Sequence, residues 1–83
     1  MIARLAPHVR LTWQPAREEW LLVLPEAVVV LNDTAADVLR LCDGVRDVDA
    51  IVSELKATYD DVAAADVDEL LRDLAGQRLV VLT

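Results

Sequence analysis

The feature that most constrains the fold of this chain is a single change in the spacing of its apolar residues, at Asn32. Before Asn32 the apolar residues alternate with polar ones or form short runs, which is typical of β-strands. After Asn32 they recur every three or four residues, which is typical of amphipathic helices. Strands that precede a block of helices, rather than alternating with them, predict an α+β fold.

Three strands are predicted in the first part of the chain, over residues 9–14, 20–24 and 27–31. In the first, Val9, Leu11 and Trp13 alternate with polar residues, as in a half-buried strand. The other two form the run WLLVLPEAVVVLN, which is broken at Pro25-Glu26 because proline lacks the N–H that a ladder needs. Apolar strands that reach solvent normally carry charges that discourage pairing with other chains. This run is therefore either buried on both sides, or it exposes a strand because the function of the protein depends on that exposure.

Two helices are predicted directly after the strands. The first begins at Asp33 or Thr34, and Gly44 suits the left-handed position just past its end. Asp47 suits the N-cap of the second, whose apolar face extends to Tyr59.

A third helix is predicted over about residues 64–75, with Gly76 ending it. Residues 78–82 form an apolar tail that is expected to be strand-like or to pack extended on the core. With 83 residues the chain is expected to be one domain, 1–83. The predicted architecture is winged-helix-like, with a three-stranded antiparallel sheet followed by three helices.

The net charge of −7 lies entirely in the helical part of the chain. Residues 1–32 carry three arginines and three glutamates, whereas residues 33–83 carry twelve acidic and five basic residues. Such a balance repels nucleic acid and anionic lipid. No signal peptide and no bilayer-spanning segment is recognised, and a single cysteine fits a reducing compartment, so we expect a cytoplasmic protein without membrane or nucleic-acid partners.

Catalysis and metal binding have little support in the sequence. His8 is the only histidine and has no cysteine pair beside it, so no metal site is predicted. Cys42 lies on the apolar face of the first predicted helix and is expected to be a core residue. The carboxylates fall at helix caps or on outward helix positions, and no nucleophile–base pair or phosphate-binding glycine loop is found. We therefore predict neither an enzyme nor a cofactor.

Five segments of the chain, in order, resemble the PqqD family of pyrroloquinoline quinone biosynthesis. The most telling features are the PE pair before an aliphatic strand that ends in LN, and LCDG at the end of the first predicted helix. The segments are PHVRL (7–11), EEWLLVLPEAVVVLN (18–32), TAADVLRLCDG (34–44), IVSELKATYD (51–60) and DVDELLRDLAGQRLV (66–80).

The resemblance implies a RiPP recognition element, which is a non-catalytic peptide chaperone without a cofactor. Such a module binds the precursor peptide PqqA by β-strand addition and presents it to the radical SAM enzyme PqqE. The resemblance places the peptide beside the third strand, in a cleft closed by the third helix. It implies a peptide site formed by Val28, Val29, Val30, Leu31, Val67, Leu70, Arg72, Asp73 and Leu74. Because side chains alternate along a strand, we expect the three valines to be divided between peptide and core.

Three alternatives remain open from the sequence. The chain could be the recognition module of another RiPP pathway, because related modules serve other modified peptides. It could be a winged-helix DNA-binding regulator, although the acidic third helix disfavours this. The free strand edge could also pair with a second copy, so that the protein is either a monomer or a strand-exchanged homodimer.

Overall fold

A computed structural model describes the whole chain, residues 1–83, as six strands and three helices. In chain order the elements are β1 (Ile2–Leu5), β2 (Arg10–Gln14), β3 (Glu19–Val23), β4 (Val28–Leu31), α1 (Asp33–Leu41), β5 (Asp43–Asp47), α2 (Val48–Thr58), α3 (Ala64–Gly76) and β6 (Val80–Leu82). The three predicted strands, the three predicted helices and the strand-like tail are thereby confirmed.

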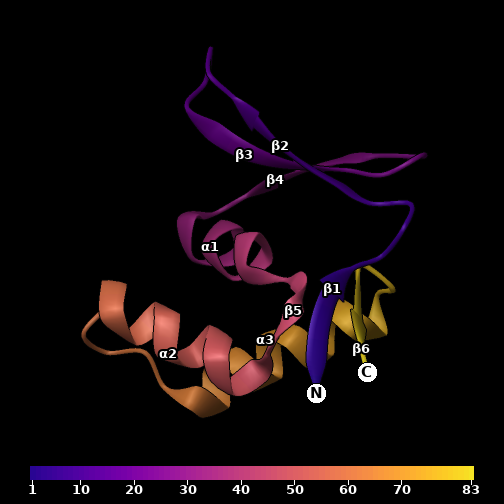
Figure 1. Cartoon of the computed structure of the whole chain (residues 1–83). Helices are drawn as coiled ribbons and strands as arrows, with labels where there is room; N and C mark the ends of the chain where they lie inside the picture. Colours follow the sequence, from indigo (N-terminus) through magenta and orange to yellow (C-terminus); the bar gives the residue numbers. More distant parts are fainter.

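The prediction of a single sheet is wrong, because the strands form two antiparallel sheets of three strands each. One has the order β2-β3-β4 and is the predicted sheet. The other has the order β5-β1-β6 and joins both ends of the chain to the segment between α1 and α2. Figure 1 shows α1 between the β2-β3-β4 sheet and the layer that contains α2 and α3.

Two strands, β1 and β5, were not predicted from the sequence. The β5 strand forms through pairing with β1 rather than through its composition. Its sequence, DGVRD, has one apolar residue, and Asp43 folds it locally by accepting hydrogen bonds from the backbone N–H of Val45 and of Arg46, both at 3.0 Å. These two N–H groups lower the pKa of the Asp43 carboxyl, because they stabilise its charged form. A polar strand of this kind gives no periodic signal, so its pairing with β1 cannot be read from the sequence.

The starts of α1 and α2 agree with the capping rules, with one shift, whereas Ala63 before α3 makes no side-chain cap hydrogen bond. Asp47 caps α2 as predicted, and its Oδ1 accepts from Ala50 N–H at 2.8 Å. The cap of α1 is Asn32 rather than Asp33 or Thr34, and its Oδ1 accepts from Ala35 N–H at 2.8 Å. Since Asn32 directly follows β4, the edge of one sheet continues without a loop into α1.

The prediction that α3 ends at Gly76 is confirmed, but the left-handed residue is not this glycine. Gly76 is the last helical residue, and the left-handed residue that reverses the chain is Arg78, with a φ of +63°. Leu79 N–H donates to Leu74 O at 3.0 Å and Arg78 N–H to Ala75 O at 3.0 Å, which is the hydrogen-bond pattern of a Schellman motif. Arginine therefore occupies a position that glycine usually takes.

One apolar core joins the two sheets and all three helices. It is a cluster of 15 buried residues, in which Leu22, Val38, Ile51 and Leu71 are fully buried. Cys42 belongs to this cluster, which confirms its prediction as a core residue. No helix is long and apolar enough to cross a bilayer.

Candidate functional site

The β4 strand forms an open edge of the β2-β3-β4 sheet, in which β3 is the central strand. Leu24 N–H donates to Ala27 O at 2.8 Å, and hydrogen-bonded pairs alternate along an antiparallel ladder. The β4 residues that bond to β3 are therefore Val29 and Leu31, which lie opposite Leu22 and Trp20. The backbone N–H and C=O groups of Val28 and Val30 point away from β3, toward the open edge.

The expected division of the three valines between peptide and core is wrong, because none of them is buried. Val28, Val29 and Val30 are 58%, 42% and 59% exposed. Figure 1 shows the β2-β3-β4 sheet extending beyond the helices, so only the end of β4 approaches the core. Leu31, at that end, is half-buried and packs against the core cluster.

The two faces of β4 differ in their surroundings. Val29 lies opposite Leu22, whose side chain is fully buried, so Val29 is on the face that turns toward the core. Val28 and Val30 lie opposite Val23 and Leu21, on the outer face. The outer face thus carries four apolar side chains next to the open edge.

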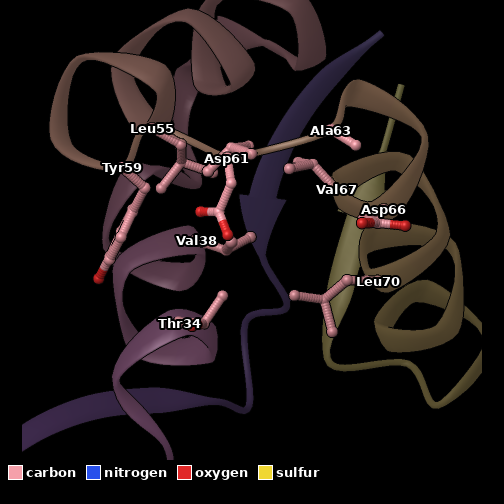
Figure 2. A pocket seen from close by; sticks show the side chains of 10 residues that line it. Thr34, Val38, Leu55, Tyr59, Asp61, Ala63, Asp66, Val67 and Leu70 are labelled. Atoms are coloured by element: carbon pink, nitrogen blue, oxygen red, sulfur yellow. The ribbon is translucent and has the colours of Figure 1, made fainter.

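An apolar cleft of about 200 Å³ begins where β4 ends. Thr34, in the first turn of α1, lies in its wall, only three residues after Leu31. Figure 2 shows the cleft between α1 and α3, with the segment that joins α2 to α3 running across it. Its lining residues are Thr34, Val38, Leu55, Tyr59, Asp61, Val62, Ala63, Asp66, Val67 and Leu70.

The residues of α3 proposed from the resemblance fall in three different places. Val67 and Leu70 line the cleft, and Figure 2 shows both side chains pointing from α3 into it. Leu74 is buried in the core and does not line the cleft. Arg72 and Asp73 are exposed, and Arg72 Nε donates to Asp68 Oδ2 at 2.7 Å. The structure therefore brings Val67 and Leu70 into one cleft with Thr34, and leaves Arg72 and Asp73 on the surface of α3.

Several lining residues were not singled out from the sequence, and Tyr59 is the most informative of them. Its hydroxyl donates to an Asp37 carboxylate oxygen, which connects the end of α2 to α1. This hydrogen bond, together with desolvation, raises the pKa of the Tyr59 hydroxyl. The sequence offered one signal for its role in the site: Tyr59 is the only tyrosine and directly follows an amphipathic helix.

The structure offers little for covalent or metal chemistry. No group of three or more His, Cys, Asp and Glu side chains is placed to hold a metal ion. Burial, and to a smaller extent Asp43, raises the pKa of the Cys42 thiol to about 11, and its Sγ donates to Val38 O at 3.3 Å. The thiol is therefore protonated at neutral pH and is not a nucleophile.

Comparison with known proteins assigns the chain to a family. The profile of the family described as coenzyme PQQ synthesis protein D (PqqD) matches residues 19–80. A PqqA binding protein of Rhodopseudomonas palustris is 38% identical over 74 residues, which are 86% of this chain and 72% of that protein. A PqqA binding protein of Methylococcus capsulatus is 37% identical over 59 residues, and the match covers 71% of this chain and 63% of that relative.

A solved structure has the same fold. It is the solution NMR structure of the PqqD truncation of Methylobacterium extorquens PqqCD, described as a functional and stand-alone RiPP recognition element. It superposes with a TM-score of 0.71 at 34% sequence identity, over 96% of this chain and 88% of that one. From the profile match, the identities and the shared fold, the chain belongs to the PqqD family.

Proposed function

We propose that this chain is a non-catalytic peptide chaperone of pyrroloquinoline quinone biosynthesis. It binds the leader of the precursor peptide PqqA as an added strand along β4 and presents the peptide to the radical SAM enzyme PqqE. The relatives named PqqA binding proteins support the choice of peptide. The observation that carries the mechanism is the open edge of β4, with free N–H and C=O groups at Val28 and Val30, next to the apolar cleft.

Strand addition divides the recognition between main chain and side chains. The backbone of the leader pairs with Val28 and Val30, which gives affinity with little dependence on sequence. Leader side chains that alternate across the new strand meet the outer-face valines on one side and Val29 on the other. Where β4 ends at Leu31, the leader continues over the cleft, and Leu70 supplies an apolar wall for one side chain.

A titration followed by backbone amide NMR tests this proposal. Isotope-labelled protein is titrated with a synthetic PqqA leader, and saturable shifts are expected for residues 27–31 and for 64–77. The shifts of β2, at the other edge of the sheet, are expected to remain small. Shifts that spread evenly over the chain, or the absence of saturable shifts, would refute the proposal.

A matched pair of variants at Val30 separates the main-chain contact from the side-chain contact. Val30→Pro removes an N–H that faces the open edge and leaves the bonds to β3 in place, as proline does on edge strands. The loss of one net hydrogen bond is expected to weaken leader binding by roughly 2- to 12-fold. Val30→Ala keeps the N–H, so it is expected to bind more tightly than Val30→Pro.

The presentation step has its own readout. Addition of the wild-type chain is expected to raise the rate at which PqqE modifies PqqA, and addition of Val30→Pro is expected to raise it less. If both proteins stimulate PqqE equally, the open edge of β4 is not the route of presentation.

A further inference from the structure

The apolar cleft at the end of β4 carries two carboxylates and no base. Asp61 and Asp66 are among its lining residues, and none of the others is lysine, arginine or histidine. Figure 2 shows the Asp61 side chain reaching from the segment between α2 and α3 toward Val38, while Asp66 lies on α3 beside Val67. Both carboxylates are exposed and the other lining residues are mostly apolar, so negative charge lies at the rim of an apolar cleft.

Neither carboxylate has a cationic partner within the chain. The three ion pairs of the structure use other acids: Arg40 pairs with Asp37, Arg46 with Asp43 and Arg72 with Asp68. Asp66 lies in the first turn of α3, where the helix dipole favours an acid. Asp61 lies outside α2 and α3, so the dipole does not account for it.

We infer that this cleft selects leaders in which a lysine or arginine lies beside a large aliphatic side chain. The inference rests on the proposed function, because it concerns the peptide that β4 captures. A volume of about 200 Å³ is below the usual range of small-molecule pockets, so the cleft fits one side chain rather than a cofactor. The aliphatic side chain packs against Val67 and Leu70, and the neighbouring cation extends its stem along the rim to reach Asp61 and Asp66.

The test compares two variants that lose the same charge. Asp61→Asn with Asp66→Asn removes both rim carboxylates. The control, Asp60→Asn with Glu69→Gln, removes two exposed carboxylates from the same two segments, neither of which lines the cleft. Each protein is titrated at low and at high salt with a synthetic PqqA leader, and with a copy of it in which every lysine and arginine is replaced by glutamine. Amide spectra of both variants verify that they fold.

The rim variant is expected to bind the native leader about three- to tenfold more weakly than wild type, since each exposed ion pair contributes little. The control is expected to bind like wild type at high salt, and the difference between the variants to shrink there. The glutamine leader is expected to bind wild type and the rim variant equally. Equal weakening in both variants, or a glutamine leader that binds wild type as tightly as the native one, would overturn the inference while leaving strand addition intact. If the native leader fails to bind wild type, the proposed function fails and the inference with it.

Discussion

The end of α3 permits a sharp test of the backbone argument, because its glycine and its left-handed residue are two positions apart. Gly76 lies in the helix, where glycine costs about 0.5–1 kcal/mol relative to alanine. Arg78 has a φ of +63°, which costs a residue with a Cβ roughly 1–2 kcal/mol. Replacing Gly76 with alanine and Arg78 with glycine puts each residue type in the conformation that it prefers.

The two changes should each stabilise the protein. A Cβ at Gly76 meets no atom within 4 Å, so Gly76→Ala should add up to about 0.5–1 kcal/mol to the free energy of unfolding. Arg78→Gly relieves the left-handed strain but adds about 0.4–1 kcal/mol of unfolded-state entropy, which leaves a net gain of about 0.5–1 kcal/mol. For a domain of this size each kcal/mol raises Tm by roughly 4–8 °C.

Thermal unfolding followed by circular dichroism measures these shifts, and Arg78→Ala is the matched control. Alanine removes the guanidinium but keeps the Cβ, so it should leave Tm close to that of wild type. If Arg78→Ala stabilises as much as Arg78→Gly, the guanidinium and not the backbone is unfavourable, and the reasoning is refuted. A lower Tm for Arg78→Gly would refute it as well.

Three further outcomes follow from the core and the cleft. Alkaline pH should destabilise the fold, because the pKa of the Cys42 thiol is near 9 in the unfolded chain and about 11 in the folded one. Roughly 2–3 kcal/mol of the free energy of unfolding should be lost between these two pH values. Urea titrations of wild type and Cys42→Ala should diverge over that range. Tyr59→Phe removes the hydrogen bond to Asp37 and should lower both Tm and leader affinity, measured by calorimetry. Leu71→Ala should cost about 2–5 kcal/mol of stability because Leu71 is fully buried, whereas Leu70→Ala, one residue away in the cleft, should weaken leader binding more than folding.

Local signals in the sequence predict most of the elements of this fold. The periodicity around Asn32 separates strands from helices, and the caps at Asp47 and near Asn32 follow from side chains that bond to the nearest N–H groups. The second sheet escapes this reasoning because β1 and β5 are stabilised by pairing between residues about 40 positions apart, such as Arg4 with Asp43. Long-range pairing of a polar strand has no local signature.

The candidate site divides in the same way between local and long-range information. The edge position of β4 could be predicted, because Pro25 interrupts the run and Asn32 starts a helix directly after it. The exposure of its three valines could not be predicted, because it depends on how far the sheet extends past α1. The cleft could not be predicted, because it includes Tyr59 and Asp61 from the segment after α2. Only the packing of the helices brings these residues into one cleft with Leu70.

The residues that flank β4 bear on whether this uncharged apolar strand pairs with copies of itself. The strand has no charge within it, but Glu26 precedes it in the turn and Asp33 follows it in α1. Charges that flank an apolar strand are a common protection against aggregation. A second copy brings the same acids to the same edge and meets repulsion within the Debye length of about 8 Å. A leader with a cation beside an aliphatic residue avoids this repulsion, and at the neighbouring cleft its cation meets Asp61 and Asp66.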